Sequence, residues 1–172
     1  HSMVDRLGPT PFVDGISAEW HDDDTVSYSP GAGRFEWGER NYAGQVGLAV
    51  ATRYALAVGL DAIAGRVGVL ASQLRADLEA IDGVEVLDEG HHRSGIVTFR
   101  VDGTDCASVA AALAGRRINV GAPARRNAQW DLGRRGLDAV VRVGVHYFNT
   151  GAELDRLTMA VGEISAAGRS RS

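Results

Sequence analysis

One apolar stripe constrains the fold of this chain more than any other feature of its sequence. Between residues 60 and 81, apolar side chains recur at steps of three and four: Leu60, Ile63, Val67, Leu70, Leu74, Leu78 and Ile81. This spacing places them on one face of an α-helix, which must pack on another layer. We therefore expect a helix over residues 60–81. We also expect Leu74→Ala to lower the melting temperature clearly and Arg75→Ala to leave it unchanged.

Shorter apolar runs around this helix predict the rest of the fold. Residues 96–101 alternate, with Val97, Phe99 and Val101 on one face, as in a half-buried strand. The expected elements are helices over residues 43–58, 60–81, 106–115 and after Thr150, and strands over residues 84–87, 96–101, 118–120 and 139–146. This order predicts an α/β chain whose main part is an α+β small domain. Its sheet would be small, mostly antiparallel and covered by helices on one face.

The chain divides by composition into five parts. Its first 33 residues hold few periodic apolar positions and carry several Pro and Gly residues, as in connecting segments. We expect residues 1–3 to be a cloning remnant, 4–33 an extended segment with at most one short strand, left from another domain, 34–59 a linking segment and helix, 60–168 the small domain, and 169–172 a polar tail.

Bulk composition narrows the classes of function. The chain has 172 residues, a net charge of −4 and 45% apolar residues, which suits one soluble globular domain. A nucleic-acid surface needs a basic excess and a membrane span needs a far longer apolar run, so we expect neither partner. Cys106 is the single cysteine, which excludes an internal disulfide and fits the reducing cytoplasm.

No lysine occurs in the sequence, so all 18 Lys and Arg residues are arginines. A Schiff base or a P-loop needs a lysine amine, and this chain alone cannot provide one. A compositional bias that replaces Lys by Arg accounts for part of this, but a functional lysine would survive such a bias.

The last expected strand carries the clearest candidate site residue. Strand side chains alternate, so Arg142, Gly144 and His146 share the face opposite to three valines. An arginine followed by a residue without a side chain leaves space for an anion, and guanidinium suits a carboxylate bidentately. Spacing alone favours the alternative, in which Arg142 pairs with a structural Asp or Glu.

Two histidine-containing runs could suggest a metal site. They are His91-His92 and residues 21–24, a His followed by three Asp. Adjacent ligands on a loop rarely satisfy the geometry of a metal, and nothing else completes a set. We therefore expect solvated loop residues and no metal.

Three phrases of the sequence together resemble the class V aminotransferase-like family of pyridoxal-phosphate (PLP) enzymes, which includes cysteine desulfurases and isopenicillin N epimerase-like proteins. They are RFEWGERNYA at 34–43 followed by VGL at 46–48, GIVTF at 95–99, and GL at 136–137 followed by VVRVGVHYFNT at 140–150. Their order and spacing agree over residues 34–165. The resemblance implies the C-terminal small domain of a type I PLP fold, from a homodimer whose large domain, with the cofactor lysine, lies upstream and is missing.

The resemblance also implies roles for individual residues. Arg142 would bind the α-carboxylate of an amino-acid substrate, and Arg40 and Asn41 would lie where many members contact the PLP phosphate. Glu39 departs from the pattern there and would repel a phosphate. No catalytic residue and no covalently bound cofactor is expected in this chain, which would be inactive alone because the cofactor lysine is absent.

The absence of one cysteine reduces the number of reactions that the resemblance allows. Cysteine desulfurases of this family keep a nucleophilic cysteine in the loop between the last two strands, here residues 121–138, and this loop has none. The implied parent protein is a lyase, an epimerase or a transaminase rather than a Cys-dependent desulfurase.

Two other readings stay open. The chain could be a stand-alone ferredoxin-like module that binds or regulates without catalysis, or a structural partner of a separate cofactor-bearing chain. Residues 4–33 favour the enzyme reading, because Trp20 in this segment has no obvious core to join.

Overall fold

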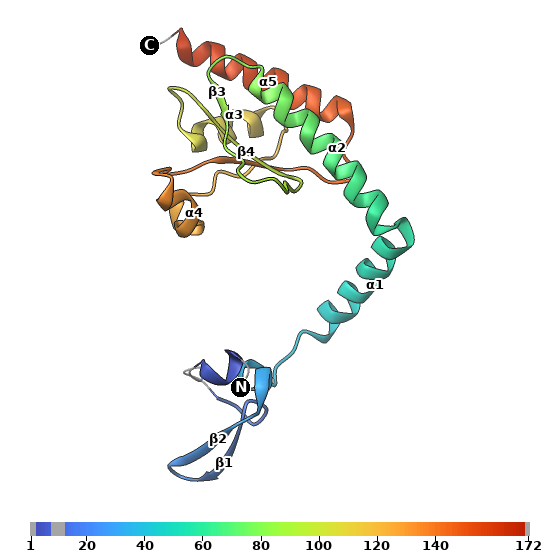
Figure 1. Ribbon diagram of the computed structural model, residues 1–172, viewed down its shortest axis with the longest axis vertical. Coiled ribbons are helices and arrows are strands. Elements are labelled where there is room, and N and C mark those ends of the chain that lie inside the picture. The colour runs from blue at the N-terminus through green and yellow to red at the C-terminus, as the bar shows by residue number, and fades with distance from the viewer. Residues whose placement is uncertain (1–2, 8–12, 171–172) are drawn as a thin grey trace. The chain divides into compact units, whose positions relative to one another are not determined.

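The computed structural model describes residues 3–7 and 13–170 (Figure 1). The first two residues of the expected cloning remnant and the last two of the expected tail lie outside this described part. The chain forms two compact units, residues 1–54 and residues 55–172.

Residues 1–54 contain a β-hairpin where the sequence predicted at most one strand. The elements of this unit are η1 (Met3–Arg6), β1 (Ala18–Asp22), β2 (Thr25–Tyr28), η2 (Gly31–Phe35) and the first part of α1 (Tyr42–Val58). The two strands pair antiparallel, from Ala18 opposite Tyr28 to Asp22 opposite Thr25. The backbone N–H of Asp24 donates to Oδ1 of Asp22 (3.1 Å), so the acidic run forms the hairpin turn.

Residues 55–172 form the expected α+β domain. Its elements are α2 (Leu60–Glu79), β3 (Val84–Val86), β4 (Ile96–Val101), α3 (Cys106–Gly115), η3 (Arg125–Asn127), α4 (Gln129–Arg134), β5 (Val141–Gly144) and α5 (Gly151–Arg169). The three strands form an antiparallel sheet in the order β3-β4-β5. Helices α2, α3 and α5 pack on one face of this sheet (Figure 1).

The predicted alternation and the predicted helical stripe meet in one core. Val97, Phe99 and Val141 are fully buried on the helix-covered face of the sheet. Leu74 and Leu78 of α2 are fully buried against them, whereas the start of the stripe is less covered and Leu60 is exposed. Two of these helices are capped at their N-termini, because Asp105 accepts from Ser108 N at α3 and Thr150 forms a capping box with Glu153 at α5.

Two predictions fail between α3 and β5. Residues 118–120 form no strand; single bridges join Gly121 to Arg142 and Ala124 to Ala139 instead. The expected loop over 121–138 contains η3 and the short helix α4. Leu132 of α4 is buried in a small second cluster with Leu87 and Val140, and this tertiary contact stabilises a helix too short to be read from local sequence.

The expectation for Arg75 is wrong. Its side chain is buried and forms an ion pair with Asp88, 2.7 Å from Nε to Oδ2. One terminal nitrogen donates to the carbonyls of Ser94 (2.8 Å) and Ile96 (2.9 Å). Because β3 ends at Val86, Arg75 takes the place of a strand neighbour along this edge of β4. Position 75 is therefore part of the packed structure, and we expect Arg75→Ala to destabilise the fold.

No single helix of the described residues is long and apolar enough to cross a membrane. Helices α1 and α2 meet that test only when they are taken together across the break between them.

Candidate functional site

Arg142 lies on the face of the sheet opposite to α2, α3 and α5. Helix α4 covers one end of this face, where Leu132 packs on Leu87 and Val140, and the rest is open. This open face carries Glu85, Ile96, Thr98, Arg100, Arg142 and Gly144. In the pairing of β4 with β5, Thr98 stands opposite Arg142 and Ile96 opposite Gly144. A Cβ added at Gly144 would meet nothing within 4 Å, so the space beside Arg142 is open. The predicted division of β5 into a valine face and an arginine face is therefore confirmed.

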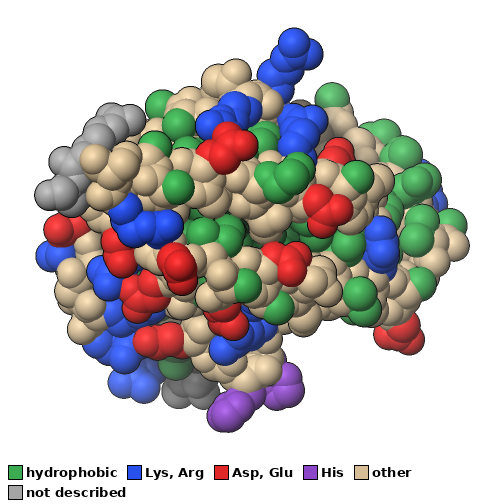
Figure 2. All heavy atoms as spheres, turned by 90° about the horizontal axis from the view of Figure 1, so that it is seen from above, with side chains coloured by type: hydrophobic (Ala, Val, Ile, Leu, Met, Phe, Trp, Pro, Cys, Tyr) green, Lys and Arg blue, Asp and Glu red, His purple; other side chains and the backbone are tan. Residues whose placement is uncertain are grey.

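The guanidinium of Arg142 has no acidic partner among the described residues. Figure 2 shows acidic and basic side chains intermingled over the side of the molecule in view. Several arginines of the described residues form ion pairs. On the open face itself, Arg100 forms an ion pair with Glu85. Neither an ion pair nor a side-chain hydrogen bond involves Arg142 in the described part of the chain. The alternative of a structural ion pair finds no support in this geometry.

The residues next to Arg142 leave room for a ligand. Its backbone is held by Gly121 in both directions, with N···O distances of 2.8 and 2.9 Å. A Cβ at Gly121 would lie 3.7 Å from Nε of Arg142, so the guanidinium lies close over a residue without a side chain. Glycines on two sides therefore border the one free cation that we find on the open face of the described sheet.

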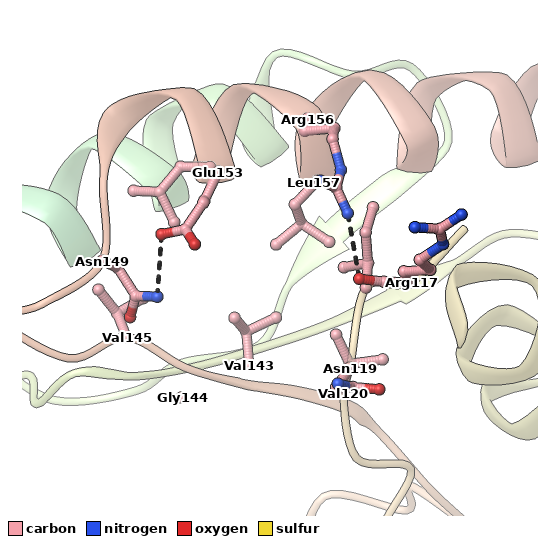
Figure 3. A pocket seen from close by; sticks show the side chains of 12 residues that line it. Arg117, Asn119, Val120, Val143, Gly144, Val145, Asn149, Glu153, Arg156 and Leu157 are labelled. Atoms are coloured by element: carbon pink, nitrogen blue, oxygen red, sulfur yellow. Dashed lines mark hydrogen bonds between the residues drawn. The ribbon is translucent and has the colours of Figure 1, made fainter. Parts of the chain in front are cut away.

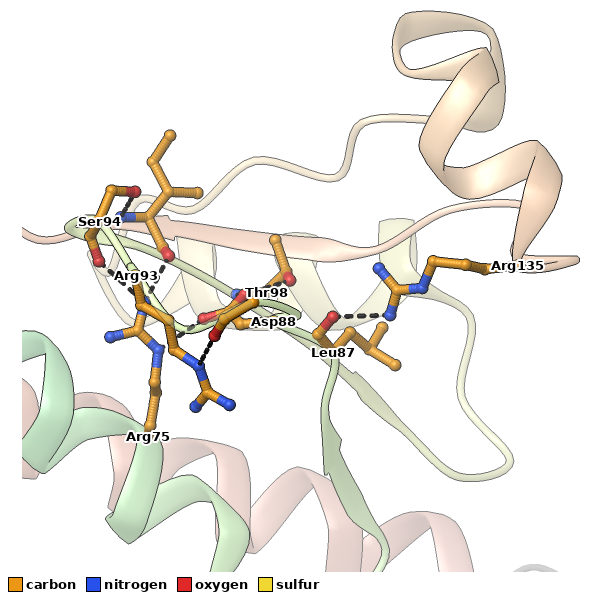
Figure 4. A network of polar contacts seen from close by, with 9 residues as sticks. Arg75, Leu87, Asp88, Arg93, Ser94, Thr98 and Arg135 are labelled. Carbon is orange, nitrogen blue, oxygen red and sulfur yellow. Dashed lines mark hydrogen bonds and ion pairs between the residues drawn. The ribbon is translucent and has the colours of Figure 1, made fainter.

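A buried polar network fixes the strand opposite Arg142 (Figure 4). Oδ1 of Asp88 accepts from the backbone N–H (2.8 Å) and the hydroxyl (2.6 Å) of Thr98, and Oδ2 accepts from Arg75. Sequence reasoning missed this network, because its members lie ten or more residues apart. The hydroxyl of Thr98 donates to Asp88, and no hydrogen bond joins it to Arg142 among the described residues.

Arg40 and Asn41 lie in the other compact unit, so each candidate is described within its own unit. Arg40 forms an ion pair with Glu36, and both side chains are partly exposed. Oδ1 of Asn41 accepts from the backbone N–H of Gly44 (2.8 Å) at the start of α1. Both side chains thus have local roles, and their contact with a cofactor phosphate stays a prediction.

Cys106 lies on the helix-covered face of the sheet, opposite to Arg142. It begins α3 and packs against the core. Burial, with Asp105 beside it, raises the pKa of its thiol, which disfavours the nucleophilic thiolate. Within the described residues, no group of three or more His, Cys, Asp or Glu side chains is arranged to hold a metal ion.

The family model for aminotransferase class V matches residues 12–157. The chain belongs to the class V aminotransferase family. Members of this family use PLP, and one solved relative of the fold, C-DES, carries glycine covalently linked to that cofactor. The resemblance seen in three short phrases is confirmed over most of the chain.

The relatives of this chain are named as more than one kind of enzyme. A cysteine desulfurase of Synechococcus elongatus is 34% identical over 80% of this chain, and a probable hercynylcysteine sulfoxide lyase of Mycobacterium tuberculosis is 33% identical over 76% of it. The apo cysteine desulfurase of Thermococcus onnurineus NA1 superposes with a TM-score of 0.77 and 25% identity over 96% of this chain. The chain spans only 22%, 33% and 41% of these three proteins, respectively.

Proposed function

We propose that this chain is the substrate-carboxylate-binding small domain of a PLP-dependent lyase, epimerase or transaminase that acts on an amino acid. The observation that carries the proposal is the unpaired guanidinium of Arg142 on the open face of the sheet, bordered by Gly121 and Gly144. We divide the chain as its composition suggests: a segment left from the large domain (4–33), a linking segment and helix (34–59) and the small domain (60–168).

The chemistry of this position fits an α-carboxylate. A guanidinium donates two parallel N–H groups to the two oxygens of a carboxylate, and such charge-assisted hydrogen bonds are stronger than neutral ones. Gly144 leaves the adjacent place on the strand empty, where the Cα of an amino acid would lie. The charge of Arg142 is not neutralised by an acidic side chain of the described residues, so a substrate anion would neutralise it.

Persulfide chemistry on a cysteine of this chain is not part of the proposal. Cys106 lies across the sheet from Arg142, and its thiol pKa is raised. The loop over residues 121–138 contains no cysteine. The relative named hercynylcysteine sulfoxide lyase is as similar to this chain as several relatives named cysteine desulfurase, which supports carbon–sulfur lyase chemistry as one candidate.

The residues present do not by themselves fit a PLP site. The sequence has no lysine to meet the aldehyde of the cofactor, and Arg40 is paired with Glu36. A cofactor phosphate would have to displace Glu36 or use backbone N–H groups near Asn41. We therefore derive no chemical step through PLP on this chain, and we expect it to be inactive alone.

A large domain and a second subunit complete the proposal. The relatives are longer than this chain, and a lysine-bearing large domain is the partner that the proposed chemistry requires. We propose a homodimer in the cytoplasm, consistent with a single cysteine. Membership of an enzyme family over residues 12–157 supports this reading over a stand-alone regulatory module or a structural partner.

Arg142→Lys tests the proposal. In the longer enzyme, the substitution keeps the charge and loses the planar fork, so kcat/KM should fall by about 10- to 100-fold. In this chain, the free energy of unfolding should change by less than about 0.5 kcal/mol, because no acidic partner is orphaned. Arg100→Lys, on the same face but paired with Glu85, is the matched control and should leave kcat/KM unchanged. A clear drop in melting temperature with unchanged kcat/KM would make Arg142 a structural residue.

A further inference from the structure

A cavity lies on the helix-covered face of the sheet, between α5, the end of β5 and residues 117–120 (Figure 3). Its volume is about 350 Å³, within the range of small-ligand pockets. Its floor is apolar and buried, formed by Val143, Val145, Leu154 and Leu157. Arg142 points to the other face and does not line this cavity, although Gly144 lines it and also borders Arg142.

The cavity opens where an expected strand pairing is missing. The single bridge between Gly121 and Arg142 would, if continued in antiparallel register, place Asn119 opposite Gly144. The chain diverges instead, and Asn119 and Gly144 both line the gap. The sequence predicted a strand at 118–120, and the departure from that strand creates the pocket.

Arg117, at the rim of this cavity, has an unusual backbone conformation. Its φ is +59°, and it is the single described residue other than glycine with positive φ; six glycines share that sign. It follows the C-terminus of α3, where Arg117 N donates to Ala114 O and Ile118 N to Leu113 O. This is the Schellman arrangement, in which glycine is strongly preferred because a Cβ is strained there. An arginine therefore stands at a backbone position that favours glycine.

The rim carries its positive charge at one end. Arg156 donates to the carbonyls of Arg116 (3.2 Å) and Arg117 (3.1 Å), which fixes its guanidinium at the backbone of Arg117 (Figure 3). The guanidinium of Arg117 has no hydrogen bond or ion pair with the described residues. Glu153 lies at the other end, where it accepts from Thr150 N (2.8 Å) and Asn149 Nδ2 (3.3 Å).

We propose that this cavity binds a small amphipathic monocarboxylate, with its carboxylate at Arg117 and Arg156 and its apolar body over Val143 and Leu157. Two neighbouring guanidinium groups bind a carboxylate well. The apolar floor cannot replace the hydration of a polyanion, so binding of one would be unfavourable. Burial of a short aliphatic or aromatic group on this floor would be favourable. The inference does not depend on the role of Arg142.

The first test titrates this 172-residue chain with sodium hexanoate and follows backbone amide signals by NMR. Saturable shifts should concentrate at residues 117–120 and on α5 around Leu157. Hexan-1-ol, which lacks the charge, should bind at least about 10-fold more weakly, since charge-assisted hydrogen bonds are lost. Inorganic phosphate should not compete. Equal binding of hexanol, effective competition by phosphate, or shifts elsewhere would each overturn the proposal.

Arg117→Gly separates a binding role from a structural one. Removing the strained Cβ should raise the melting temperature by roughly 2–4 °C, while hexanoate affinity should fall by about 10-fold or more. Arg116→Ala is the matched control: it is the adjacent arginine, it pairs with Glu163 rather than lining the cavity, and it should leave hexanoate affinity unchanged. A lower melting temperature for Arg117→Gly, or hexanoate affinity equal to that of the unsubstituted chain, would contradict the assignment.

Discussion

Different interactions stabilise the interior of each of the two compact units. In residues 55–172, a continuous apolar core joins the sheet to three helices, and every buried apolar side chain of the described residues lies between Leu70 and Val161. Among the described residues of the range 1–54, Ser17 alone is buried. Large apolar side chains are exposed along α1, among them Val46, Val50 and Tyr54. The stability of the second unit therefore comes from burial of apolar area, whereas the first depends on local hydrogen bonds.

The polar contacts of the two units differ in the same way. In the second unit, Arg75 and Asp88 are almost fully buried, so each charge needs the other as its ion-pair partner. In the first unit, Asp14 accepts from three backbone N–H groups close to solvent, those of Ile16, Ser17 and Gly38. Exposed hydrogen bonds of this kind contribute less and respond to pH and local opening. We expect substitutions in the second unit to affect global stability and those in the first to act locally.

Arg75→Ala should have the largest effect. Removal of the guanidinium leaves Oδ2 of the buried Asp88 carboxylate and the carbonyl of Ile96 without their Arg75 donor, and breaking one partner of a buried ion pair costs about 3–5 kcal/mol. Urea unfolding measures the difference. The matched control is Arg134→Ala, which removes an exposed ion pair with Glu89 and should cost less than about 1 kcal/mol. Similar losses for both would show that the buried network is not what distinguishes this unit.

Leu74→Ala comes next. Leu74 is fully buried in the core, and truncation of a buried leucine typically costs about 2–5 kcal/mol, depending on how far the cavity collapses. Val69 lies on the same helix and is 67% exposed, so Val69→Ala should change the free energy of unfolding by less than about 0.5 kcal/mol. Thermal unfolding of both variants checks the assignment of the stripe, which equal effects would contradict.

The sequence predicted the second unit much better than the first. The core of residues 55–172 follows from periodicity, because helical and strand spacing each place apolar side chains on one face. The same logic placed Arg142 opposite the valines of β5. The hairpin β1-β2 has little burial behind it: most of its side chains are exposed and Trp20 is 71% exposed. Without an inward face there is no strong period to read.

Most of the missed features of the second unit depend on tertiary contacts. Arg75 follows Leu74 directly, and nothing in local spacing indicates that it reaches Asp88 and two carbonyls of another segment. Helix α4 depends on the burial of Leu132 beside Leu87 and Val140. Residues 118–120 have the composition of a strand, but the turn at Arg117 directs them away from β5. The first two cases are long-range contacts that override a local preference, and the third is a helix end whose αL residue is an arginine.

The smallest predicted effect tests how the first unit is held. Three backbone N–H donors, of which Gly38 (2.6 Å) contributes most, lower the pKa of Asp14 from 3.8 to about 2. Because the folded pKa lies below the unfolded value, this contribution to stability is fully present above about pH 4. It is lost as the pH falls through about 2, when the carboxylate takes up its proton.

An NMR titration of the backbone amide signals of Gly38 and Ile16 should therefore show a midpoint near pH 2. Asp14→Asn should abolish this midpoint and leave the signals of the core strand β4 unchanged, since Asp14 belongs to the other compact unit. Asp105→Asn is a suitable control, because Asp105 also has a lowered pKa but accepts from Ser108 in the second unit. If Asp14→Asn leaves the titration of the Gly38 signal unchanged, or if the signals of Gly38 and β4 shift at the same pH, then this carboxylate does not hold the segment before Arg40. The contrast between a unit held by local hydrogen bonds and a unit held by its core would then fail.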